Sequence, residues 1–190
     1  ATSLDATVGV TREDRRGGLF DSADGRQAVD TLRVDAGLAA RRPVSTGVFV
    51  GKAAFVRLDH DHRYNTETFS DAHDALMLEG SYLWSRGRHT LVAGGGLDWQ
   101  RYDGSRDDLN YSWVTPAVFV QDDVDVGDRM RMSLSARVDR HPEFGWLWSP
   151  RASVRWALDP WDVRVSAGRG AFVPTPFIDE VEEIGVHQVT

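Results

Sequence analysis

The chain has 190 residues, which is long enough for one domain with a hydrophobic core. Its formal net charge of −7 argues against nucleic-acid binding, and the absence of cysteine excludes disulfides, thiolate metal sites and a thiol nucleophile. No apolar run reaches the roughly 18 residues that a transmembrane helix needs, so no such helix is predicted.

A period-two alternation of apolar and polar residues recurs along the chain, and no segment has a convincing helical period. It predicts about nine strands, which are, in chain order, 3–12, 27–39, 46–59, 75–85, 89–102, 113–126, 130–140, 150–158 and 162–171. In the clearest of them Met130, Met132 and Leu134 alternate with arginine and serine. Many of these strands have about ten residues, the length of a tilted membrane-spanning strand, whereas soluble strands have about five or six.

Short and long connections alternate between the predicted strands. Tight turns are expected at 40–45, 85–88, 126–129 and 158–162, and long loops at 13–26, 60–74, 103–112 and 141–149. Transmembrane β-barrels alternate in this way, with short turns at one rim and larger loops at the other. The predicted fold is therefore all-β, an antiparallel up-and-down meander of about nine strands that forms part of a larger transmembrane β-barrel.

Tryptophan and tyrosine gather beside the predicted turns and loops. These residues are Trp84, Trp99, Tyr102, Tyr111, Trp113, Trp156 and Trp161. Amphipathic rings at both strand ends are typical of the aromatic girdles of a membrane barrel, although each ring alone fits the end of an ordinary sandwich core. In a barrel the Val, Trp and Met face contacts lipid and the Arg, Ser and Asp face lines a wet lumen, since arginine costs about 2–4 kcal/mol at the bilayer midplane.

Two short segments hold histidine beside aspartate: 59–62, which reads Asp-His-Asp-His, and 73–74, which reads His-Asp. Imidazole and carboxylate are plausible metal ligands, but alternation points neighbours to opposite faces of a strand, so we expect a solvated loop and no metal site. The glycines at 94–96 lack the lysine and helix of a phosphate-binding loop. No catalytic residue and no cofactor site is predicted.

Four sequence elements follow one another in the second half of the chain. They are Phe119, Gln121 and Asp122; Arg137 and Asp139; Ser149, Pro150 and Arg151; and Gly168, Arg169 and Gly170, after which comes Pro174. In this order they resemble the mid-barrel region of TonB-dependent outer-membrane receptors, and the resemblance is strongest over 115–180. The family's barrel has about 22 strands around an N-terminal plug domain. The resemblance therefore implies that 1–190 is a partial barrel domain without a plug.

The resemblance also implies a function and partners. It implies a bacterial outer-membrane transporter, not an enzyme, that takes up scarce ligands such as ferric siderophores or cobalamin with energy relayed by TonB. Its partners would be outer-membrane lipid, a plug domain, TonB and the small-molecule ligand. Two alternatives remain: a plugless porin-like or adhesin-like barrel, and a soluble β-sandwich that binds carbohydrate on surface tryptophans.

The predicted lumenal face carries several arginines. They are Arg131, Arg137, Arg151, Arg155 and Arg164. They are expected to attract anionic ligands or pair with plug carboxylates, or else only to solvate the lumen and pair across strands.

Overall fold

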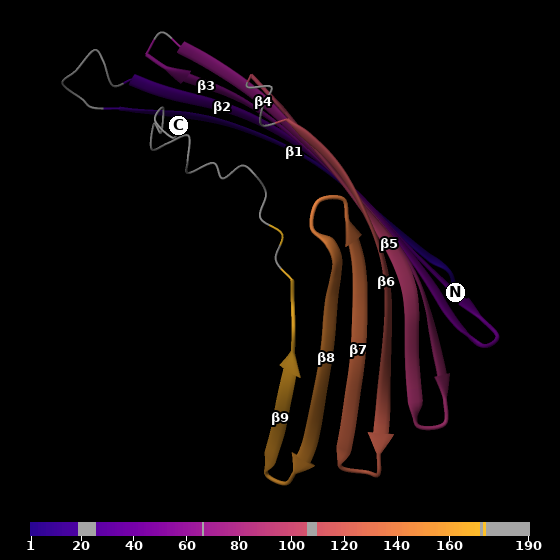
Figure 1. The fold of residues 1–190 in the computed structure, drawn as a ribbon. Coiled ribbons are helices and arrows are strands. Elements are labelled where there is room, and N and C mark those ends of the chain that lie inside the picture. Colours follow the sequence, from indigo (N-terminus) through magenta and orange to yellow (C-terminus); the bar gives the residue numbers. More distant parts are fainter. Residues whose placement is uncertain (19–25, 66, 106–109, 172, 174–190) are drawn as a thin grey trace.

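The structure is a computed structural model that describes residues 1–18, 26–65, 67–105, 110–171 and 173. Its strands are β1 (Ser3–Gly18), β2 (Arg26–Val44), β3 (Gly47–Tyr64), β4 (Glu67–Arg86), β5 (His89–Gly104), β6 (Tyr111–Val126), β7 (Met130–His141), β8 (Gly145–Leu158) and β9 (Trp161–Gly168). They pair in sequence order as one antiparallel nine-stranded sheet, and Figure 1 shows that it is open and curved. The predicted all-β meander is confirmed. Among the described residues no helix has the length and hydropathy to cross a bilayer.

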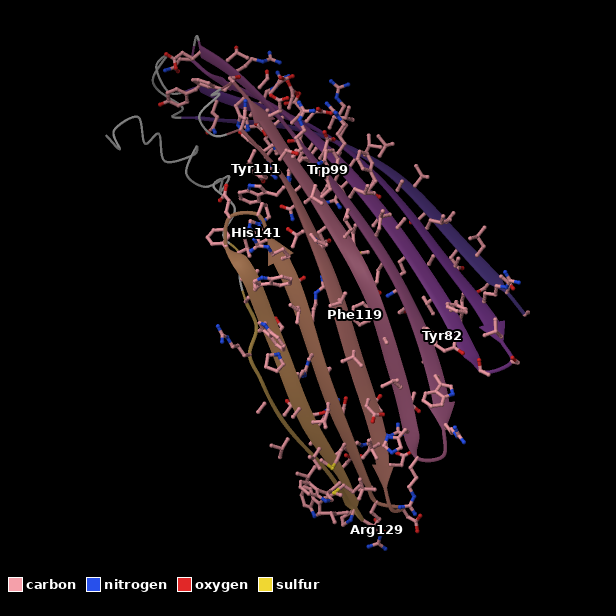
Figure 2. All side chains as sticks on the ribbon, turned by 45° about the vertical axis from the view of Figure 1, so that its right-hand side comes forward. Tyr82, Trp99, Tyr111, Phe119, Arg129 and His141 are labelled. Carbon is pink, nitrogen blue, oxygen red and sulfur yellow. The ribbon has the colours of Figure 1, made fainter. Side chains whose placement is uncertain are left out.

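The two ends of the sheet differ in their connections. At the end that we call the turn end, the turns 45–46, 87–88, 127–129 and 159–160 join successive strands. Glycine at 87 and 127 takes φ of +61° and +71°, a backbone region that other residues rarely adopt. Figure 2 shows Arg129 at the turn end and Tyr111 and His141 toward the opposite end, which we call the loop end.

Two of the predicted long loops are wrong. Most of the segment 60–74 belongs to β3 and β4, which are joined at 65–66, and β8 begins at Gly145, so only 142–144 join it to β7. The predicted loops 13–26 and 103–112 are also partly strand within the described residues. The ends of β1 and β3 are polar on both faces, so they lack the alternation by which a strand is recognised in a sequence.

The register divides the side chains into two faces. Residues that are paired across neighbouring strands point to the same side of the sheet. The series of pairs that starts with Thr7↔Gly37 on β1 and β2 and ends with Arg155↔Arg164 on β8 and β9 lies on one surface, which we call the polar face. The opposite surface, the apolar face, holds most of the exposed large apolar side chains: Leu4, Val8, Val10, Leu32, Leu38, Phe49, Leu78, Val114, Val118, Val120, Leu134, Trp146, Trp148, Trp156, Trp161, Val163 and Val165. An exposed apolar surface of this extent marks an interaction site.

The apolar face ends before the strands do. On β3, the side chains of this face are apolar as far as Phe55 and are then those of Arg57, Asp59 and Asp61. On β1, they are apolar as far as Val10 and charged beyond it. The strands therefore continue at the loop end as a polar extension.

In the polar extension of β1, ion pairs form between residues that are two positions apart. Arg15 donates a hydrogen bond to Glu13, which holds the pKa of that carboxyl below its usual value. Arg16 does the same for Asp14. Such pairs suit a strand end surrounded by water.

Candidate functional site

Three of the five buried residues in the described part of this single-layered sheet belong to an aromatic cluster on the polar face near the loop end. Tyr102 and Trp113 are each 6% exposed and His141 is 4% exposed. Tyr111 stacks on Trp113 with ring centroids 4.2 Å apart and on Tyr102 at 5.9 Å. His141 meets the Trp113 ring edge-on at 4.8 Å. This cluster joins β5, β6 and β7 and supports the surface beside it.

A cavity of about 410 Å³ opens on the polar face beside that cluster. Its lining residues include Asp98, Gln100, Trp113, Thr115, Arg137, Asp139, His141, Leu147 and Ser149. Of these lining residues, Arg137 lies 2.8 Å from Asp139 and 3.5 Å from Asp98. Two carboxylates thus share one guanidinium on a wall that also presents hydroxyl and amide groups. Such a surface suits a polar ligand or a protein segment rich in hydrogen-bonding groups.

The other predicted inward arginines also lie on the polar face, by register. Arg131 contacts Asp125 at 2.6 Å, and Arg155 contacts Asp162 across the turn that precedes β9. Gly168 leaves space for Arg151, because a Cβ at Gly168 would lie 3.2 Å from the Arg151 side chain. These pairs are largely exposed, so they orient the arginines more than they stabilise the sheet.

The four sequence elements lie on β6–β9 and just beyond β9. Phe119, Gln121, Arg137, Asp139, Ser149, Arg151 and Gly168 lie on the polar face, whereas Asp122 and Pro150 lie on the apolar face. Asp122 contacts His89 at 2.8 Å, and Gln121 donates a hydrogen bond to Asp123. Arg169 and Gly170 follow β9 in an irregular segment, and the backbone N–H of Arg169 donates to the carbonyl of Pro150. Pro174 lies outside the described residues.

The predicted girdle residues divide between the two faces. Trp84, Trp99, Trp156 and Trp161 lie on the apolar face, as a girdle requires. Tyr102, Tyr111 and Trp113 lie on the opposite face, in the buried cluster. Sequence analysis missed Trp146 and Trp148, which are 66% and 56% exposed on the apolar face. The alternation of Trp-Leu-Trp over 146–148 was the available signal.

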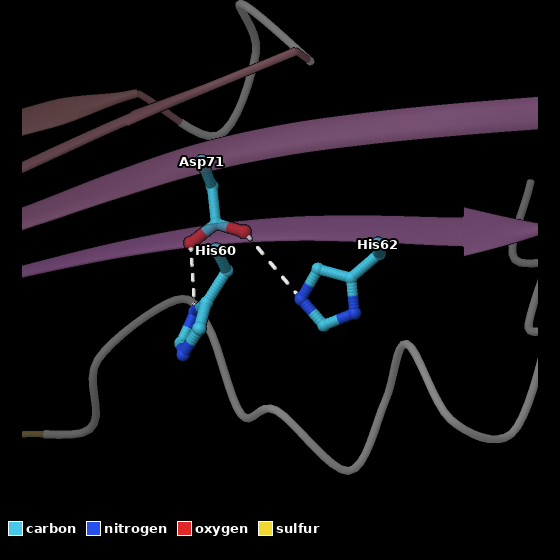
Figure 3. Close-up of side chains that lie close together, drawn as sticks. All are labelled: His60, His62 and Asp71. Carbon is cyan, nitrogen blue, oxygen red and sulfur yellow. Dashed lines mark hydrogen bonds and ion pairs between the residues drawn. The ribbon is translucent and has the colours of Figure 1, made fainter. Parts of the chain in front are cut away.

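Two histidines and an aspartate meet on the polar face of β3 and β4, in the polar extension (Figure 3). His60 Nδ1 lies 3.3 Å from one carboxylate oxygen of Asp71, and His62 Nε2 lies 3.7 Å from the other. The ligand atoms of these three residues all lie within 4.8 Å of one another. The alternation argument correctly separates His60 and His62 from Asp59 and Asp61. It overlooked Asp71, which the pairing of β3 with β4 places directly opposite His60.

Comparison with known proteins identifies a family and similar solved structures. Residues 4–179 match the family model described as TonB dependent receptor-like, beta-barrel. The crystal structure of the siderophore receptor PirA from Pseudomonas aeruginosa superposes with a TM-score of 0.78 at 14% identity, over 92% of this chain and 31% of that chain. The translocator domain of the autotransporter NalP from Neisseria meningitidis matches with a TM-score of 0.44 at 13% identity, over 89% of this chain and 68% of that one. No curated protein matches in sequence.

Proposed function

This chain belongs to the TonB-dependent receptor-like β-barrel family, and we propose that it forms part of the barrel of an outer-membrane active transporter. The chain spans about a third of the length of the siderophore receptor that it resembles, namely 31%. The remaining strands, a plug domain and the TonB contact are therefore proposed to belong to the whole protein. The edge strands β1 and β9 would pair with those further strands and leave no open edge.

The observation that carries this proposal is the division of the sheet into two faces. Along the apolar stretch of the strands, exposed valine, leucine and tryptophan cover one face, while Arg131, Arg137 and Arg155 with their carboxylate partners occupy the other. A large apolar face is unfavourable when it is exposed to water, whereas contact with lipid removes this free-energy cost. On β7 the apolar stretch from Met130 to Val138 has the length that a tilted strand needs to cross a bilayer.

Both alternatives fit less well. A soluble sandwich needs a second sheet over the apolar face, and the described residues form a single sheet. A plugless barrel would keep the same two faces, but the family match favours a receptor whose lumen holds a plug.

The proposed ligand is a scarce, chelated nutrient such as a ferric siderophore, with cobalamin as the other member of the class. Support comes from the fold shared with a siderophore receptor and from the polar wall around Arg137, Asp98 and Asp139, which offers hydrogen-bonding groups to a polar ligand. At 14% identity this likeness supports the class of ligand and not its identity.

The test uses the full-length protein in its own outer membrane. Its gene is deleted and restored, and uptake of radiolabelled ferric siderophores and cobalamin is measured with and without a functional TonB protein. The expected result is uptake of at least one ligand that needs both this protein and TonB. Uptake that persists without TonB would indicate a porin-like channel, and an unchanged set of imported ligands after deletion would remove the transport proposal.

A further inference from the structure

The inference concerns His60, His62 and Asp71, which we call the β3–β4 triad. His60 and His62 are two residues apart on β3, so both imidazoles leave the sheet on the polar face. Asp71 is the direct partner of His60 on β4 and shares that face. The register of β3 and β4 alone therefore brings three side chains with metal-ligating atoms close together.

The triad is well shielded. The side chains of His60, His62 and Asp71 are 11%, 19% and 8% exposed. The Asp71 carboxylate lies between the two rings and turns one oxygen toward each (Figure 3). Around Zn²⁺, nitrogen and carboxylate ligands at about 2.0–2.2 Å would lie roughly 3.3 Å from one another. The distances of 3.3 and 3.7 Å from Asp71 to the two histidines are already close to that spacing.

The charge around the triad also differs between the two faces. On the apolar face of the same strands, Arg57 contacts both Asp59 and Asp74, and Ser70 donates a hydrogen bond to Asp61. Those carboxylates therefore have partners on their own face. On the polar face, the register positions next to the triad hold Gln27, Val29, Thr31, Arg33, Leu58, Tyr64, Phe69, His73, Tyr102 and Gly104. Arg33, which lies diagonally across from His60, is the one lysine or arginine at these positions, and its carboxylate partner is Asp35 at 3.3 Å.

We propose that the β3–β4 triad binds a divalent transition-metal ion through two imidazoles and one carboxylate. Imidazole favours Zn²⁺, Cu²⁺ and Ni²⁺ over Mg²⁺ and Ca²⁺, which prefer oxygen ligands. Three protein ligands leave a fourth position for water or for a donor atom of an arriving complex. The triad lies in the polar extension at the loop end, so the ion is held beyond the apolar stretch of the strands.

Metal binding at the triad does not depend on transport, so the two proposals fail separately. If the purified protein binds no ion but uptake persists, only the metal site is wrong. If the ion binds but the protein transports no ligand, only the transport function is wrong.

The experiment titrates the full-length protein, purified in detergent, with Zn²⁺ and measures bound metal by equilibrium dialysis. One site is expected, and His60→Ala, His62→Ala and Asp71→Asn should each weaken it by more than about 100-fold, since loss of outer-shell partners alone costs 10–100-fold. His89→Ala is the matched control, because His89 faces Asp122 as an isolated pair on the apolar face. Far-UV circular dichroism checks that each variant keeps its strands.

A second measurement avoids dependence on any variant. Cu²⁺ bound to the unmodified protein should give an electron paramagnetic resonance spectrum with hyperfine structure from two imidazole nitrogens. A spectrum without nitrogen coupling, or Zn²⁺ binding that is equal in the triad variants and in His89→Ala, would overturn the proposal.

Discussion

The ring of Phe119 on β6 lies where a side chain on Gly94 of β5 would lie. The two residues are direct partners across the ladder, and a Cβ added to Gly94 would be 2.6 Å from Cζ of Phe119. The same Cβ would be 2.5 Å from the backbone oxygen of Gly80 on β4. Glycine at 94 therefore lets the ring occupy this place on the polar face. This contact gives the glycine run at 94–96 a packing role.

Substitution of Gly94 should destabilise the sheet. Gly94→Ala places a methyl group against backbone that has no room to move, and such overpacking costs about 1–3 kcal/mol. The measurement is the free energy of unfolding of the full-length protein in detergent, by urea titration. Gly80→Ala is the control, because a Cβ at Gly80 has no atom within 4 Å. Equal stability of the two variants would show that Phe119 does not depend on Gly94.

A single arginine can test which face contacts lipid. Val118 is 63% exposed in the middle of the apolar face, and Val118→Arg should cost about 2–4 kcal/mol of folding free energy in vesicles. Ser133→Arg places the same side chain on the polar face, opposite Asp123, and should cost little. The measurement is reversible unfolding in lipid vesicles. A larger loss for Ser133→Arg would reverse the assignment of the two faces.

The aromatic cluster should contribute more to stability than the exposed tryptophans. Trp113→Ala removes the stack on Tyr111, the contact with His141 and the hydrogen bond to Glu143, so a loss of about 3–5 kcal/mol is expected. Trp148→Ala, at a side chain that is 56% exposed, should lose less. Thermal unfolding in detergent compares the two. If Trp148→Ala lost as much as Trp113→Ala, the cluster would not be the core of this part of the sheet.

Because the chain has no cysteine, single added cysteines report which end of the sheet faces the cell exterior. Asp61→Cys lies in the polar extension of β3, and Asp128→Cys lies in the turn 127–129 at the turn end. A membrane-impermeant maleimide should label Asp61→Cys on intact cells and label Asp128→Cys only after the outer membrane is opened. The reverse pattern would place the turn end outside.

The full length of the strands and the clustering of Tyr102, Tyr111 and Trp113 across β5 and β6 were not predicted from the sequence. Strand recognition relied on alternation, which vanishes where both faces meet water, as at Asp61 and Arg63 near the end of β3. Tyr102 and Tyr111 were assigned to a girdle because they stand beside a loop. Alternation along β5 already puts Tyr102 on the face opposite Trp99, three residues earlier. That Tyr102 meets Tyr111 depends on the pairing of β5 with β6, which has no local signature in the sequence.

The sequence by itself determined the fold class, the order of the strands and the division into an apolar and a polar face. These properties follow from local patterns, since alternation within one strand is enough to reveal that its two sides meet different surroundings. Only the tertiary structure decided which residues meet across strands, such as Gly94 with Phe119 and Asp71 with His60. Those contacts depend on the offset between neighbouring strands, which is set by backbone hydrogen bonding along the whole ladder and has no local signature.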